Sequence, residues 1–164
     1  MTAEANQAAK LDDSVRKTVV VKAPREIAFA VFTRDMTSWW PASHHIGEAD
    51  MKAAVVEPRA GGRWYEQGAD GSECDWGTVL VWEPPERLVL DWQLNAQWQF
   101  DPEFHTELEV RFIAEGPDTT RVELEHRNMD RFGDQREATQ AALGGEGGWS
   151  GIMDRYAEAA AAAK

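Results

Sequence analysis

Residues 73–95, ECDWGTVLVWEPPERLVLDWQLN, contain the pattern that decides the fold. Two runs typical of strands, residues 73–83 and 87–95, are separated by a Pro-Pro break that leaves room only for a tight turn. In the second run, large apolar side chains occupy every other position: Leu88, Leu90, Trp92 and Leu94. This alternation predicts an antiparallel hairpin with one dry face and one wet face.

The same kind of pattern extends from this hairpin in both directions. Further predicted strands are residues 15–22, 51–58, 61–68, 104–114 and 120–127. The turn signals Asp70-Gly71 and Gly116-Pro117-Asp118 join neighbouring strands. Because such short connections hold no crossover, the sequence predicts an antiparallel sheet.

Helical spacing appears between and after these strands. A short amphipathic helix is predicted over residues 25–35, followed by a helical or irregular segment at 36–45. Residues 134–143 predict another helix, and the glycine-rich run at 144–148 interrupts it. Beyond the glycines, one apolar stripe predicts a long terminal helix: Trp149, Ile152, Met153 and Tyr156. The alanines at 157 and 159–163 have little to pack against, so we expect this end to fray.

These elements predict a single α+β domain over residues 14–164, with residues 1–13 as a disordered tail. The apolar face of the sheet needs a cover, and the terminal helix is the only predicted element large enough to provide it. We therefore expect a curved sheet wrapped around the C-terminal helix, with two short helices after the first strand.

Composition excludes several classes of function. The formal net charge is −12, and the basic residues are dispersed, so we expect no nucleic-acid partner. The sequence has no long apolar run and no apolar signal-peptide core, so we expect neither membrane insertion nor export. With the single Cys74 no internal disulfide forms, and we expect a cytoplasmic protein without a cofactor.

Several motifs resemble a known family. They are Gly61-Gly62-Arg63-Trp64, the stretch 76–88, Trp92, Leu124-Glu125-His126 and Gly147-Gly148-Trp149. In this order and spacing they resemble the SRPBCC/START superfamily and, more narrowly, the family named for the activator of heat-shock protein 90 ATPase. The resemblance covers residues 15–160.

This resemblance implies a helix-grip fold, in which a bent sheet encloses the C-terminal helix around an internal cavity. It does not imply one chemistry, because the fold serves lipid carriers, hormone receptors, cyclases and chaperone activators. The eukaryotic activator engages its chaperone through an additional N-terminal domain that this sequence does not match. A chaperone contact is therefore an alternative and not our first expectation.

Eight tryptophans give the chain a heavy aromatic load. Alternation places several on the concave face of the sheet, together with Thr78 and Leu80, where they either fill a core or wall a pocket. The candidate ligand-binding residues are Trp39, Trp40, Trp64, Glu66, Trp76, Trp82, Trp92, Phe112, His126, Trp149, Met153 and Tyr156. Trp39 or Trp40 is expected on a mobile lid over the cavity mouth.

Two candidates carry polar chemistry. Glu66 shares the parity of Trp64 and, if it points inward, is a costly buried carboxylate with a purpose; the alternative is that a bulge turns it outward or that it pairs with Arg63. His126 ends the last strand on the inward parity, either as a ligand donor or base or as a satisfied core histidine. Adjacent His44-His45 have no third ligand at a suitable spacing, so no metal is predicted.

The sequence therefore predicts non-catalytic binding of a small hydrophobic or amphipathic molecule, in a monomer or homodimer. The first alternative is a cyclase or hydrolase that uses the same cavity, with Glu66 or His126 as acid or base. The second alternative is a chaperone-interaction module that acts through its outer surface. Cys74 lies between two acidic residues, which raise the pKa of a thiol, so we do not expect it to act as a nucleophile.

Overall fold

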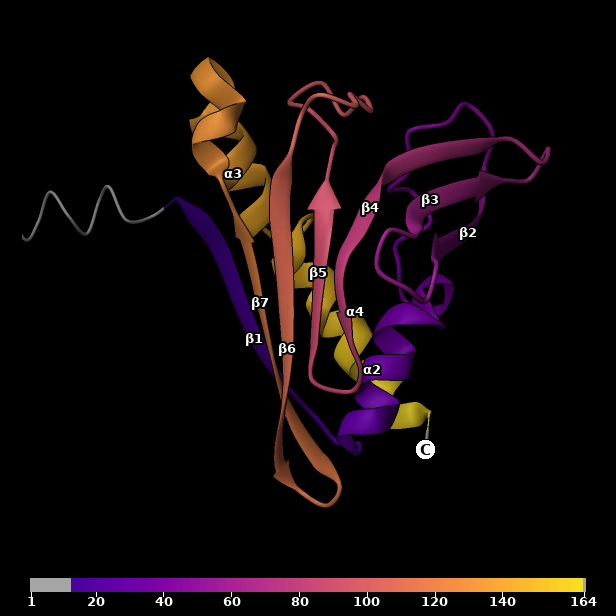
Figure 1. The fold of residues 1–164 in the computed structure, drawn as a ribbon, viewed down its shortest axis with the longest axis vertical. Helices are drawn as coiled ribbons and strands as arrows, with labels where there is room; N and C mark the ends of the chain where they lie inside the picture. The colour runs from indigo at the N-terminus through magenta and orange to yellow at the C-terminus, as the bar shows by residue number, and fades with distance from the viewer. Residues whose placement is uncertain (1–12, 164) are drawn as a thin grey trace, which may run out of the picture.

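The computed structural model describes residues 13–163, so the predicted tail falls outside the described residues apart from Asp13. Within this range the chain forms one antiparallel sheet of seven strands in the order β1-β7-β6-β5-β4-β3-β2 (Figure 1). The strands are β1 Ser14–Val21, β2 Met51–Val56, β3 Arg63–Gly68, β4 Glu73–Glu83, β5 Arg87–Trp92, β6 Thr106–Gly116 and β7 Thr119–Arg127.

The helices are α2 Arg25–Thr33, α3 Arg136–Gly144 and α4 Trp149–Ala162, with 3-10 segments η1 Met36–Ser38 and η2 Met129–Gln135. Figure 1 shows α4 running behind the sheet, whose β2 and β3 bend away from the long strands β1 and β5–β7. The predicted bent antiparallel sheet around a long C-terminal helix is confirmed. No helix in the described part of the chain is long and apolar enough to cross a membrane.

The predicted apolar stripe of α4 faces the core. Met153 and Tyr156 are fully buried, and the Tyr156 hydroxyl donates to the Ala28 carbonyl at 2.7 Å, which fixes α4 against α2. The expectation that the alanine end frays is wrong, because α4 continues to Ala162 and Ala160 is fully buried. A small side chain is what lets the helix approach its neighbours closely there.

The predicted inward face of β4 is partly wrong. Leu80 is 43% exposed, whereas Val79 is buried at 1%. The pairing of β4 with β5 shifts register between Val79 and Val81, and its pairing with β3 shifts next to Trp64. Each bulge inserts one residue and reverses the parity beyond it, so Thr78 and Leu80 turn outward while Trp76 and Trp82 keep the inward side.

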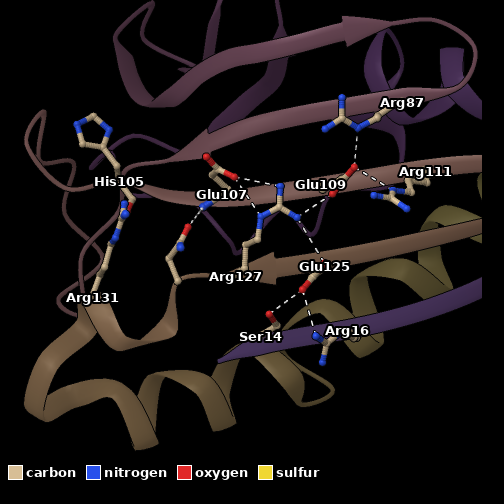
Figure 2. Close-up of polar contacts among 11 residues, drawn as sticks. Ser14, Arg16, Arg87, His105, Glu107, Glu109, Arg111, Glu125, Arg127 and Arg131 are labelled. Atoms are coloured by element: carbon tan, nitrogen blue, oxygen red, sulfur yellow. Dashed lines mark hydrogen bonds and ion pairs between the residues drawn. The ribbon is translucent and has the colours of Figure 1, made fainter. Parts of the chain in front are cut away.

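The outer face of the sheet carries a network of charges (Figure 2). Glu109 lies at its centre, only 4% exposed, and accepts hydrogen bonds from Arg87, Arg111 and Arg127 at 2.6–2.9 Å. Burial raises the pKa of Glu109, but the three guanidinium groups outweigh it and hold the pKa at about 2. The network keeps the convex face polar, so a site for an apolar ligand has to lie on the concave face.

Candidate functional site

A cavity of about 520 Å³ lies at one end of the concave face. Its walls come from four places: the segment after η1, the inward faces of β4 and β5 with the loop that follows β5, the glycine-rich junction of α3 and α4, and the first turns of α4. The lining residues are Trp40, Ser43, His44, His45, Ile46, Trp76, Trp92, Leu94, Trp98, Ala141, Ala142, Leu143, Gly145, Gly147, Gly148, Trp149 and Ile152.

The junction of α3 and α4 forms because of its glycines. A β-carbon at Gly148 would lie 2.3 Å from the carbonyl oxygens of Ala142 and Leu143, so the turn closes only around a residue without a side chain. The helix break predicted at residues 144–148 is confirmed, and it puts the end of α3 beside Trp149 at the start of α4.

Five indole rings surround the cavity. Trp40 stacks at a tilt on Trp76, with ring centroids 5.0 Å apart, and meets Trp149 edge to face at 5.8 Å. Trp92 contacts Trp149 at 5.8 Å and Trp98 at 6.5 Å. Four of the rings are buried, whereas Trp98 is 45% exposed at the cavity rim. Such walls suit a flat apolar guest.

The four buried indole nitrogens already have partners inside the protein. Trp40 donates to the His44 carbonyl and Trp92 to the Leu94 carbonyl, while Trp76 donates to Glu66 and Trp149 to His126. No ligand group is needed to satisfy them. These rings therefore offer their faces and edges to a guest, and their N–H groups serve to hold the rings in place.

Glu66 points inward and is buried at 1% exposure. Its carboxylate accepts from Trp76 Nε1 at 2.8 Å, from the Ile46 backbone N–H at 2.6 Å and from the Gly47 backbone N–H at 3.0 Å. The alternative pairing with Arg63 is not formed, because Arg63 pairs with Asp75 and Glu73. Glu66 thus ties a tryptophan of the wall to the segment that carries His45 and Ile46.

The backbone at Gly47 passes close to this carboxylate. A β-carbon there would lie 3.0 Å from Glu66 Oε2 and 3.1 Å from the Cys74 sulfur, so a larger residue would push the segment away. Burial is the largest cause that raises the pKa of Cys74, followed by the Glu66 charge. Of the two flanking acids predicted to raise it, Asp75 contributes and Glu73 is not among the causes.

His126 is a fully buried, fully bonded histidine. Its Nδ1 accepts from Trp149 Nε1 at 3.1 Å, so Nε2 carries the proton and donates to Thr106 Oγ1 at 2.9 Å; Thr106 donates in turn to the Trp92 carbonyl. Burial lowers the His126 pKa to about 3. His126 supports two wall tryptophans from behind and lies outside the cavity lining.

Of the predicted binding residues, the structure brings Trp40, Trp76, Trp92 and Trp149 to the cavity wall. Glu66 and His126 lie one side chain behind it. The other six lie elsewhere: Trp39, Trp64, Phe112, Met153 and Tyr156 are buried in the core, and Trp82 lies beside Phe29 at a separate groove. Trp39 is no lid residue in this structure, since it is 1% exposed and donates to the Val31 carbonyl.

Sequence reasoning missed the histidines and small residues of the rim. The sequence pattern suggests His44 and His45 only as metal ligands and argues against that role, yet both line the cavity. Among the described residues, no group of three or more His, Cys, Asp or Glu side chains is arranged to hold a metal ion. Two features of the sequence could have indicated these residues: the apolar Ile46 in a polar segment and the glycine run before Trp149.

Comparison with known proteins agrees with this architecture. A family profile described as "Activator of Hsp90 ATPase homolog 1-like protein" matches residues 22–161. The chain belongs to this family. No curated protein matches the chain significantly.

Solved structures of the same kind are numerous, and three illustrate the range. The anthrahydroquino-γ-pyrone synthase Txn09, complexed with SUM, is 39% identical, with a TM-score of 0.63 over 88% of this chain and 95% of its own. The self-sacrificing resistance protein CalC from Micromonospora echinospora is 33% identical, with a TM-score of 0.69 over 93% and 99%.

Protein NE0264 from Nitrosomonas europaea is only 15% identical, with a TM-score of 0.65 over 92% of this chain and 96% of its own. At that identity it supports the fold alone. The predicted helix-grip fold and the predicted family resemblance are confirmed by these comparisons.

Proposed function

We propose that this protein binds a small molecule with a flat, fused aromatic ring system in the cavity between β4, β5 and the junction of α3 and α4. The observation that carries the proposal is the wall of five indole rings around one cavity, with the buried indole nitrogens satisfied within the protein. Stacking and edge contacts with such rings favour a planar guest over a flexible chain.

Size and charge support the same class of ligand. A volume of about 520 Å³ falls within the range of small-molecule sites. Among the described lining residues, only His44 and His45 have ionisable side chains, and the chain carries a net charge of −12. An anionic guest would meet an unfavourable field, so a neutral or weakly acidic aromatic molecule fits best.

The comparisons favour an aromatic ligand as well. A chain 39% identical to this one is named as a synthase of an anthrahydroquino-γ-pyrone, and the name of that product describes fused rings. This relative also supports a second candidate function, namely catalysis on such a ring system in the same cavity. In that case Glu66 and His126 are poor candidates for acid and base, because hydrogen bonds within the protein already occupy both groups.

Titration with anthraquinone, followed by quenching of tryptophan fluorescence, tests the binding proposal. We expect saturable quenching by one equivalent, and we expect Ala142→Trp, which fills the cavity from the exposed end of α3, to weaken affinity about tenfold or more. Ala138 is on the same helix but does not line the cavity, so Ala138→Trp is the matched control for adding a tryptophan to α3. Equal affinities in both variants would exclude this cavity as the site.

Native mass spectrometry of freshly purified protein complements the titration. A co-purifying small molecule that is lost in Ala142→Trp and retained in Ala138→Trp supports binding in this cavity. Incubation of that molecule with excess protein then separates the two candidate functions, since a carrier returns it unchanged and an enzyme converts it.

A further inference from the structure

His45 lies in the segment between η1 and β2, and it lines the cavity. Its Nδ1 is 2.8 Å from the Gly47 carbonyl oxygen. A carbonyl only accepts hydrogen bonds, so Nδ1 carries the proton and the neutral ring has its lone pair on Nε2. Among residues 13–163, Nε2 has no hydrogen-bond partner.

The chain has four histidines, all within the described residues, and the other three are committed elsewhere. His44 holds the Gly147 carbonyl at 2.6 Å through Nε2 and the Ser43 hydroxyl at 3.0 Å through Nδ1. His126 uses both nitrogens in the core. His105 bonds to Asp91 and lies outside the cavity lining. His45 is therefore the histidine that both lines the cavity and has a ring nitrogen with no hydrogen-bond partner among the described residues.

A buried carboxylate stands beside the same ring. Glu66 Oε2 lies 3.9 Å from His45 Nδ1, and its side chain is only 2% exposed. Backbone N–H groups of Ile46 and Gly47 fix this carboxylate on one side, and Trp76 fixes it on the other. The carboxylate therefore lies beside the Nδ1 edge of the His45 ring, where a positive charge on the ring would meet a negative one.

We propose that His45 is a proton-accepting residue for an acidic hydroxyl group, a phenol or an enol, on the flat ligand. This inference rests on the proposed function and adds the chemistry of the ligand's polar edge. The ligand O–H bond breaks and a new N–H bond forms at Nε2. The ligand oxygen keeps the electron pair as a phenolate or enolate, and the imidazolium charge faces Glu66 and the Gly47 carbonyl.

Other titratable groups near the ring do not change this assignment. Cys74 on β4 lies next to Glu66, and its raised pKa keeps the thiol neutral. On the segment itself, His44 is held by Ser43 and Gly147, and Glu48 is exposed. Glu66 is thus the buried carboxylate beside the Nδ1 edge of the ring, whereas the proton is accepted at Nε2.

The test uses 2-hydroxyanthraquinone as the probe, because its visible absorption shifts to longer wavelength when the hydroxyl ionises. We expect the hydroxyl of the probe to ionise at a pH at least about one unit lower when the probe is bound to the wild-type chain than when it is free. Unsubstituted anthraquinone measures binding without the hydroxyl.

Two substitutions separate hydrogen bonding from proton transfer. His45→Asn keeps an amide N–H for the Gly47 carbonyl and removes the Nε2 acceptor, so we expect both the ionisation shift and the extra affinity for the hydroxylated probe to be lost. His45→Gln places a non-basic oxygen near the Nε2 position, so we expect the affinity to remain and the shift to disappear. His105→Asn, away from the cavity, is the control and should retain both.

The outcomes distinguish the two proposals. If both His45 variants bind anthraquinone normally and still shift the ionisation of the hydroxylated probe, the His45 assignment is wrong while the proposed function stands. If the wild-type chain binds neither probe, the proposed function is wrong and the His45 assignment falls with it. Thermal unfolding of each variant confirms that it is folded, and His45→Gln alone decides the question if His45→Asn does not fold.

Discussion

The Glu66 carboxylate is the residue on which the cavity wall depends most. It accepts three hydrogen bonds from groups that are donors only, namely Trp76 Nε1 and the backbone N–H groups of Ile46 and Gly47. An uncharged amide in its place would turn an NH₂ group toward at least one of these donors. A buried donor would then be left without an acceptor.

We expect Glu66→Gln to lower the free energy of unfolding by about 1–3 kcal/mol and to weaken anthraquinone binding, because Trp76 and the segment with Ile46 lose their anchor. Urea unfolding followed by tryptophan fluorescence measures the first effect. The exposed neighbour Glu48→Gln should change stability by less than about 0.5 kcal/mol. An unchanged unfolding curve for Glu66→Gln would contradict the anchoring role.

His126 makes the stability depend on pH. Its folded-state pKa is lowered to about 3 by burial, whereas in the unfolded chain it takes up a proton below its ordinary value of 6.5. Between these values the unfolded state binds more protons, so acid destabilises the fold. The contribution is fully present above pH 6.5 and falls by up to about 1.4 kcal/mol per pH unit below it.

We therefore expect a shallower loss of stability between pH 6 and pH 4.5 in His126→Asn than in the wild-type chain. Urea unfolding at several pH values gives both slopes, and the comparison holds even if the variant is less stable at neutral pH. Other titrating groups contribute equally to both proteins. Equal slopes would show that His126 is protonated in the folded state.

At the scale of elements, the two bulges of β4 decide which side chains face the cavity. They reverse the parity of the strand twice, so Val79 is buried while Leu80 is exposed. The sequence offers no reliable sign of this reversal, because Thr78-Val79-Leu80-Val81 is apolar on both parities. By contrast, β6 pairs with β5 without a bulge and with β7 for most of its length, and there the alternation predicted the core-facing side chains correctly. The wet face predicted for β5 is wrong, because Val89, Asp91 and Gln93 are only 3–6% exposed. His105 and Pro102 bond to Asp91 and Gln93 and cover that face.

The reversal has a direct test. Val79→Thr puts a hydroxyl of nearly the same shape into a dry core, and we expect it to cost about 1–3 kcal/mol in urea unfolding. Leu80→Thr changes an exposed position and should cost less than about 0.5 kcal/mol. The opposite order of the two effects would mean that β4 keeps the simple alternation.

In the helices too, the sequence predicts features that depend on local spacing but not features that depend on contacts with distant elements. The stripe of α4 and the break at residues 144–148 were predictable, because spacing and glycine content are properties of the sequence itself. The burial of Ala160 was not, since an alanine-rich end looks alike whether or not another element covers it. Glu66 is an intermediate case. The strand alternation predicts that its side chain points inward, but it does not predict the three donors that bind its carboxylate.

At the scale of the whole molecule, the fold and family followed from the sequence better than the site did. The order of strands and the final helix are confirmed. Of the eleven predicted ligand-binding residues other than Trp39, however, only four line the cavity. The reason is that the cavity occupies one end of the concave face. Trp64 and Phe112 share that face but lie where side chains fill it completely.

Closure at the other end follows from aromatic packing between helices and sheet. Phe32 contacts Trp39, Phe112 and Tyr156 with ring centroids 5.0–5.9 Å apart, which leaves this part of the interior filled. The cavity remains where the segment after η1 and the glycine-rich junction meet with small or polar residues. Strand alternation does not report on either of these irregular segments, so the position of the cavity required the structure.

If one end of the concave face binds a flat aromatic molecule, the indole groups around that end must respond to the guest and the others must not. The most direct measurement is a ¹H–¹⁵N spectrum of the eight indole N–H groups during titration with anthraquinone. We expect the signals of Trp40, Trp76, Trp92, Trp98 and Trp149 to move with one common saturation curve, while those of Trp39, Trp64 and Trp82 move little. Saturable shifts confined to Trp39, Trp64 or Trp82, or none at all, would exclude this end of the concave face as the binding site.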